Sequence, residues 1–264
     1  MRNLPPTHPT TQRTIVVLGD SIAAGYGLPP ESAWPHRLLS LLTEAYPHLR
    51  WRMHNLSVPG DTVADAYVRF DEARQLRPDL LILALGINDC RRAASPVVAR
   101  RIEMFYRNEQ TWWGRNAMLR RLGYLLSPLP ETQPSRETSS QVPLDAFLAI
   151  LGWMMRQARA MDALPALVTM APLAPDLADD PHFGLCSRYQ TALRDAAREM
   201  EAALIEIDFL MPEGSWQGDG VHLTARGQEV VAQRVFKNFQ RPPIAAHLAL
   251  QTQESNAYMA PTLD

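Results

Sequence analysis

Apolar residues along the chain gather in five short runs that end at turn-forming residues. The runs are TIVVLG at 14–19, RWRMHNLS at 50–57, DLLILALG at 79–86, ALVTMAP at 166–172 and ALIEIDF at 203–209. Three of these runs are apolar at nearly every position, which is typical of strands that are covered on both faces. The pattern therefore predicts five strands in a buried parallel sheet.

Between the runs, apolar positions recur at helical spacing. In the first such segment Trp34, Leu38 and Leu42 fall on one helix face, and Ser32 stands where an N-cap is expected. Asp61 stands at the expected N-cap position of the second segment. The predicted helical segments are 32–45, 61–76, 144–162, 185–202 and 223–239. Strands that alternate with helices predict an α/β fold, a doubly wound sheet with right-handed crossovers.

The alternation is interrupted once, after the third predicted strand. Roughly 80 residues separate Gly86 from the next strand, whereas a whole βαβ unit needs only about 30. We interpret residues 91–143 as an insertion in a single domain that spans residues 14–240. Flexible tails are expected at 1–13 and 241–264.

The insertion differs in charge from the rest of the chain. Its first part carries eight arginines against two glutamates, in a protein whose formal net charge is -2. It also contains Trp112 and Trp113, which become candidates for substrate contact if the insertion forms a lid over the strand ends. The alternative is a structural appendage with a solvated arginine face.

Composition sets broad limits on the class of protein. A chain of 264 residues with 46% apolar residues can bury a sizeable core, and its net charge gives no indication of nucleic-acid binding. The N-terminal stretch lacks the apolar centre of a signal peptide, and no run of about 18 apolar residues occurs. We therefore expect a cytoplasmic location and no transmembrane segment, and the oligomeric state stays open.

Cysteine usage argues against a metal centre. Cys90 and Cys186 are the two cysteines, too few for a disulfide framework, and neither lies in a Cys/His cluster of the kind that holds zinc. We interpret Cys90 as a packed thiol. No metal and no cofactor is expected.

Polar residues with complementary chemistry follow the predicted strands. Ser21 comes after the first strand, Gly60 after the second, Asn88 after the third, and Asp219 and His222 after the fifth. Because the carboxyl ends of parallel strands meet at one edge of a sheet, we expect these residues to converge there.

The converging residues are those of nucleophilic catalysis. His222 can take the proton of the Ser21 hydroxyl, and Asp219 can hold the imidazole in the required tautomer. The backbone N–H groups of Ser21 and Gly60 and the amide of Asn88 are the predicted donors to an oxyanion. Each residue also has a plain structural interpretation, as a helix cap or a turn residue.

Two further acids flank these residues. Asp20 precedes Ser21, and Asp89 follows Asn88. With Asp219 and His222 they raise the alternative of a metal site. We favour hydrogen-bond partners that hold the active-site loops.

At this point the sequence resembles a known family, the SGNH or GDSL hydrolases. The residues that carry the resemblance are GDSI at 19–22, the glycine of VPGDT at 58–62, GIND at 86–89 and DGVH at 219–222. These four blocks occur in the family's order, with isoleucine where the first block usually has leucine. SAWP at 32–35 and SVPGDT resemble the bacterial thioesterase and lysophospholipase branch.

The resemblance implies a flavodoxin-like three-layer sandwich, a five-stranded parallel sheet of order 2-1-3-4-5 with a helical insertion. It also implies a metal-independent serine hydrolase that cleaves a small-molecule or lipid ester or thioester through an acyl-enzyme. Two alternatives stay open. One is an O-acyltransferase with the same triad, and the other is a catalytically silent lipid- or carbohydrate-binding module.

Overall fold

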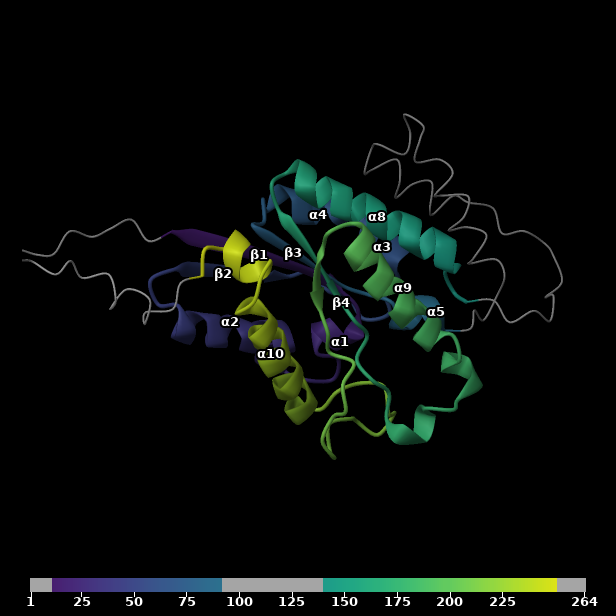
Figure 1. The fold of residues 1–264 in the computed structure, drawn as a ribbon. Helices are drawn as coiled ribbons and strands as arrows, with labels where there is room; N and C mark the ends of the chain where they lie inside the picture. The colour runs from purple at the N-terminus through teal and green to yellow at the C-terminus, as the bar shows by residue number, and fades with distance from the viewer. Residues whose placement is uncertain (1–10, 92–139, 251–264) are drawn as a thin grey trace, which may run out of the picture.

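A five-stranded parallel sheet forms the centre of the computed structural model, which describes residues 11–91 and 140–250 (Figure 1). Its strands are β1 Gln12–Gly19, β2 Arg50–Asn55, β3 Leu80–Ala84, β4 Leu164–Val168 and β5 Ala203–Ile205. They lie in the order β2-β1-β3-β4-β5. The predicted fold class and strand order are confirmed.

The apolar runs predicted as strands are buried on both faces of the sheet. In β1, Ile15 and Val17 face one core and Val16 and Leu18 face the other, and all four side chains are fully buried. This alternation follows from the two-residue period of a strand. A central strand with helices on both sides thus requires apolar residues at every position.

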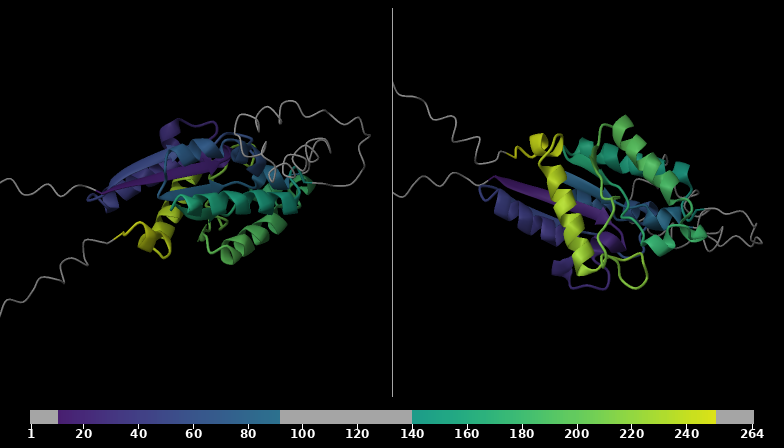
Figure 2. Two further views of the ribbon diagram at one scale, coloured as in Figure 1. Left: turned by 90° about the horizontal axis from the view of Figure 1, so that it is seen from above. Right: turned by 60° about the horizontal axis from the view of Figure 1, so that its bottom comes forward.

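Helices cover both faces of the sheet. On one face lie α2 Trp34–Ala45 and α10 Ala225–Phe239, which run beside each other in the right-hand view of Figure 2. On the other lie α3 Val63–Val68, α4 Phe70–Gln75, α8 Leu144–Ala160 and α9 Cys186–Glu199. The short helices α1 Ser21–Ala24 and α5 Ile87–Cys90 follow directly after β1 and β3, at the edge where the site was predicted (Figure 1). Within the described ranges the other elements are α11 Ile244–His247 and the 3-10 turns η1 Pro30–Ser32, η4 Pro175–Leu177 and η5 Pro181–Phe183.

Two predicted helix caps are wrong. Ser32 belongs to a 3-10 turn, and the first N–H of α2, on Trp34, donates instead to the side chain of Gln228 at 2.9 Å. Asp61 precedes the true N-cap, Thr62, whose hydroxyl and backbone form a capping box with Asp65. The predicted helix 61–76 is also divided into α3 and α4 at Arg69.

The C-terminal tail begins later than expected. Residues 241–250 pack on the domain because Ile244 and Leu248, one helical turn apart, are buried against the same core as α2 and α10. The carbonyl of Leu248 also accepts a hydrogen bond from the Arg13 side chain at 3.0 Å. The prediction of a tail from residue 241 is therefore wrong for this stretch.

Of the predicted insertion, residues 92–139 lie outside the described part of the chain, and Trp112 and Trp113 with them. Helix α8 begins at Leu144, where the insertion was expected to end. Within the residues that the structure describes, no helix combines the length and the apolar character needed to cross a bilayer.

Candidate functional site

Ser21 lies where β1 ends and α1 begins. Gly19 leaves the strand at a point with no space for a side chain, because a Cβ there would come within 2.8 Å of both Ala23 Cβ and Ser57 Oγ. Asp20 is the N-cap of α1, and its carboxylate accepts the N–H of Ile22 at 2.9 Å. Ser21 is thus the first helical residue, and its own N–H has no acceptor within the helix.

The structure brings Ser21, His222 and Asp219 into one hydrogen-bonded chain. His222 Nε2 lies 2.9 Å from Ser21 Oγ, and His222 Nδ1 lies 2.6 Å from Asp219 Oδ2. The second carboxylate oxygen of Asp219 accepts the backbone N–H groups of Val221 and His222 at 3.0 and 2.9 Å. Three hydrogen bonds therefore fix the acid, and the acid fixes the imidazole.

The electrostatics of Asp219 suit this arrangement. Partial burial raises the pKa of its carboxyl, but the hydrogen bonds from His222 and Val221 outweigh that effect and lower the pKa to about 2. Asp219 therefore remains ionised at neutral pH. An ionised acid on Nδ1 keeps the proton on that nitrogen and leaves Nε2 free to accept the hydroxyl proton of Ser21.

The loop after β2 and the short helix α5 carry the other two predicted residues. Gly60 has φ +87°, a conformation that favours glycine, in a turn where the N–H of Asp61 donates to Val58 O at 3.2 Å. Asn88, in α5, donates one amide hydrogen to the carbonyl of Asp61 at 2.9 Å. The amide has a second hydrogen, which remains for a ligand.

Asp20 and Asp89 each accept a backbone N–H at the start of a helix. Asp20 caps α1, and Asp89 Oδ1 accepts the N–H of Val63, the first residue of α3, at 2.9 Å. Burial raises the pKa of Asp20 to about 7 and that of Asp89 well above the ordinary value. Among the described residues, no group of three or more His, Cys, Asp or Glu side chains is arranged to hold a metal ion.

Because the pKa of Asp20 is raised, we predict that Asp20→Asn increases the free energy of unfolding by an amount that depends on pH. The native state binds a proton there up to about pH 7 and the unfolded chain only up to about 3.8, so this carboxyl destabilises the fold increasingly as pH rises through that window. The amide keeps an oxygen for the N–H of Ile22. We expect the variant to gain up to about 4 kcal/mol of unfolding free energy at pH 8 and almost nothing at pH 4.

Urea denaturation at these two pH values measures the difference. Asp179→Asn, at an exposed turn, is the matched control and should show no such pH dependence. A gain for Asp20→Asn that is equal at pH 4 and pH 8 would contradict the assignment of the buried proton.

The interpretation of Cys90 as a packed thiol is wrong. Cys90, the last residue of α5, forms a disulfide with Cys186, the first residue of α9. Two residues that are 96 positions apart in the sequence meet because α5 and α9 pack on the same face of the sheet. The short helix that carries Asn88 is therefore covalently attached to a long one.

A small, mainly apolar cavity of about 20 Å³ is lined by Asp20, by residues of α1 and by residues at or just after the ends of β3, β4 and β5. Its volume is that of about one water molecule. Thr169, Met170 and Ile207 form part of its wall.

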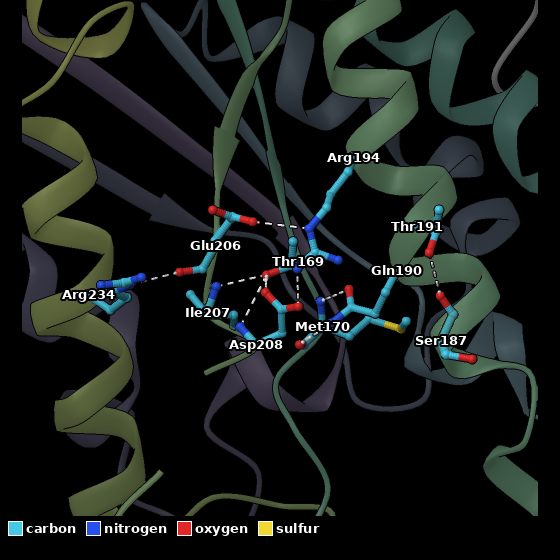
Figure 3. Close-up of polar contacts among 10 residues, drawn as sticks. All are labelled: Thr169, Met170, Ser187, Gln190, Thr191, Arg194, Glu206, Ile207, Asp208 and Arg234. Carbon is cyan, nitrogen blue, oxygen red and sulfur yellow. Dashed lines mark hydrogen bonds and ion pairs between the residues drawn. The ribbon is translucent and has the colours of Figure 1, made fainter. Parts of the chain in front are cut away.

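Figure 3 shows the polar contacts that fix this wall. Thr169 Oγ1 donates to Asp208 at 2.8 Å and accepts the N–H of Ile207 at 2.8 Å. Gln190 of α9 binds both backbone groups of Met170, at 2.8 and 2.9 Å. Arg194, also in α9, pairs with Asp208. Helix α9 thus holds both α5, which carries Asn88, and the residues that follow β4 and β5.

Three residues near the site were not predicted from the sequence. The ring of Tyr26 lies 4.6 Å from the ring of His222 and is half exposed; its position between Gly25 and Gly27 was the available signal. Gln228 is buried and joins α10 to α1 through Ile22 O at 2.9 Å. Arg69 binds Asp61. Gln228 was not predicted because its partner Ile22 O is a backbone group 206 positions away, and Arg69 because its pairing with Asp61 joins a loop to the junction of two helices.

The sequence of this chain is similar to a protein family and to two curated esterases. The model of the GDSL-like Lipase/Acylhydrolase family matches residues 17–230. An arylesterase of Vibrio mimicus is 38% identical over 85 residues, which are 32% of this chain and 42% of that protein. Esterase TesA of Pseudomonas aeruginosa is 34% identical over 92 residues, 34% of this chain and 44% of the relative. The chain spans less than half the length of these two curated relatives.

Solved structures share the fold. The crystal structure of TesA superposes with a TM-score of 0.57 at 21% identity, over 86% of this chain and 98% of the other. The acetylxylan esterase Axe2 of Geobacillus stearothermophilus superposes with a TM-score of 0.59 at 19% identity, over 87% and 94% of the two chains.

Proposed function

The chain belongs to the GDSL-like lipase/acylhydrolase family, and on that premise we propose that it hydrolyses carboxylic esters through an acyl-enzyme on Ser21. The observation that carries the proposal is the hydrogen-bonded chain from Ser21 through His222 to Asp219. Its serine and histidine are 201 positions apart in the sequence. A helix cap or a turn residue would need no such partner.

In the first half of the reaction, Ser21 Oγ attacks the carbonyl carbon of the ester while its proton passes to His222 Nε2. The Asp219 carboxylate stabilises the imidazolium that forms. The tetrahedral intermediate then collapses, the bond to the leaving group breaks, and the imidazolium gives its proton to the departing oxygen. The acyl group remains on Ser21.

In the second half, water attacks the acyl-enzyme with His222 again as the base, and Ser21 regains its proton. Both tetrahedral intermediates carry a negative oxygen. The donors proposed for it are the N–H groups of Ser21 and Gly60 and the second amide hydrogen of Asn88. Ser21 is held at the start of α1 and Asn88 by its bond to Asp61 O, and donors that are fixed before substrate arrives lower a barrier most.

Carboxylic esters are the proposed substrates because the related proteins carry the names arylesterase and esterase. Cleavage of thioesters would use the same residues, since sulfur only replaces the leaving oxygen. Thioesters are therefore the first substrates to test beyond the ester class.

Covalent labelling with a fluorophosphonate tests the proposal. We expect one adduct, on Ser21, together with hydrolysis of p-nitrophenyl esters that labelling abolishes. The matched control is Ser57→Ala, which removes another serine that lies close to Gly19; it should label and hydrolyse as the parent does.

Three outcomes would count against the proposal. An adduct at another residue, or hydrolysis that persists after complete labelling, would remove Ser21 as the nucleophile. An unlabelled enzyme that transfers acyl groups from Ser21 to added alcohol in preference to water would replace hydrolysis by acyl transfer.

A further inference from the structure

The loop that carries Gly60 is joined to the sheet at its beginning and to Asn88 at its end. Leu56 N–H donates to Val17 O at 2.8 Å, and Val58 N–H donates to Gly19 O at 3.0 Å. After the Gly60 turn, Asp61 O accepts the amide hydrogen of Asn88 at 2.9 Å. The backbone of Asp61 therefore determines the direction in which the second amide hydrogen of Asn88 points.

Arg69 holds this loop at two points. It lies at the junction of α3 and α4, and its Nη1 donates to Leu56 O at 2.7 Å while its Nη2 pairs with the carboxylate of Asp61. One planar guanidinium thus joins the first residue of the loop to the residue after Gly60. A lysine has a single charged nitrogen and lacks this fork.

The ion pair between Arg69 and Asp61 is largely buried, so it contributes little to the stability of the fold. The side chains of Arg69 and Asp61 are only 18% and 10% exposed. Burial raises the pKa of Asp61 to about 6, although the hydrogen bond and the charge of Arg69 lower it. A buried ion pair offers little net stability over apolar residues, because desolvation offsets the attraction. The pair is better explained by the geometry that it imposes.

We infer that Arg69 is a positioning residue of the oxyanion site, which acts through Leu56 and Asp61 on Gly60 and Asn88. This inference rests on the proposed hydrolase function. It differs from the view that Arg69 only stabilises a surface loop, because a positioning residue must lose its effect when the group that it positions is removed.

A double-mutant cycle with Arg69→Met and Asn88→Ala tests the inference. We expect Arg69→Met to lower kcat for a p-nitrophenyl ester about tenfold with KM changed less than twofold, because oxyanion donors act mainly in the transition state. In the Asn88→Ala background the same substitution should lower kcat threefold or less, since residues that act through one another are not additive.

Controls separate positioning from other effects of the substitution. Arg74→Met removes an arginine from α4 that pairs with Asp71 and is 60% exposed, and it should leave kcat unchanged. Because Arg69→Met leaves a buried carboxylate without its partner, Arg69→Met with Asp61→Asn removes both charges. The double variant should remain as slow as Arg69→Met if positioning was lost, and should recover if an unpaired charge was the cause.

The outcomes distinguish the inference from the function on which it rests. Equal kcat factors in both backgrounds, a loss confined to KM, or recovery in the charge-free variant would overturn the role of Arg69 while Ser21-dependent hydrolysis stands. A parent protein without esterase activity, or one whose activity survives Ser21→Ala, would overturn both. If Arg69→Met does not fold, the cycle is run with Arg69→Lys and the same criterion of non-additivity applies.

Discussion

Replacing Ser21 with alanine is expected to lower kcat for a p-nitrophenyl ester by about 10⁴-fold or more. In the proposed mechanism the hydroxyl oxygen bonds to the acyl group, and the proposed base, His222 Nε2, lies 2.9 Å from it. Any activity that remains has to come from the oxyanion donors and from substrate binding alone. Initial rates at saturating ester, with protein concentration set by absorbance, give the factor.

His222→Ala supplies the comparison within the same experiment. Because base and nucleophile act as one unit, His222→Ala should cost nearly as much as Ser21→Ala, and the double variant little more than either. The exposed His36, on α2, is the matched control, and His36→Ala should leave the rate unchanged. Losses that multiply in the double variant would mean that the two residues act in separate steps.

Among the predicted oxyanion donors, Asn88→Ala should lose about 10²- to 10³-fold in kcat with KM little changed, a smaller loss than those of Ser21→Ala and His222→Ala. The amide has one hydrogen on Asp61 O, so its orientation is fixed and the other hydrogen is aimed before the substrate binds. One such donor contributes about 3 kcal/mol to the stability of the transition state. Steady-state kinetics with a short p-nitrophenyl ester separate kcat from KM.

Two variants sharpen this prediction. Asn88→Asp keeps the shape of the side chain but replaces the donor by an acceptor, so it should be at least as slow as Asn88→Ala. Asn238→Ala removes an amide from α10 that donates to Arg234 O, and it should have the parent's rate. If Asn88→Asp were as fast as the parent, the amide hydrogen could not be the oxyanion donor.

The sheet order and the convergence of Ser21, Asp219 and His222 could be predicted because they depend on local signals. Apolar runs specify buried parallel strands, and parallel strands deliver their following residues to one edge. What could not be predicted depends on contacts between distant residues. The N–H of Trp34 donates to Gln228, Arg69 donates to a backbone carbonyl, that of Leu56, and Cys90 meets Cys186 only because α5 and α9 are neighbours. Ile244 and Leu248 were predicted to belong to a tail because the sequence does not show the core against which they are buried.

The disulfide between Cys90 and Cys186 has a topological consequence. It closes a covalent ring that contains every residue from 92 to 139. A protease that cuts once within those residues would separate Ser21, on the N-terminal piece, from Asp219 and His222 on the C-terminal piece, yet both pieces would remain in one molecule. The disulfide holds the two pieces close together, so that each has a high effective concentration for binding the other. Strand β3 of the first piece can then still pair with β4 of the second. The cut chain would therefore be a two-piece enzyme that holds together in an oxidising medium and depends on non-covalent assembly once a reductant opens the ring.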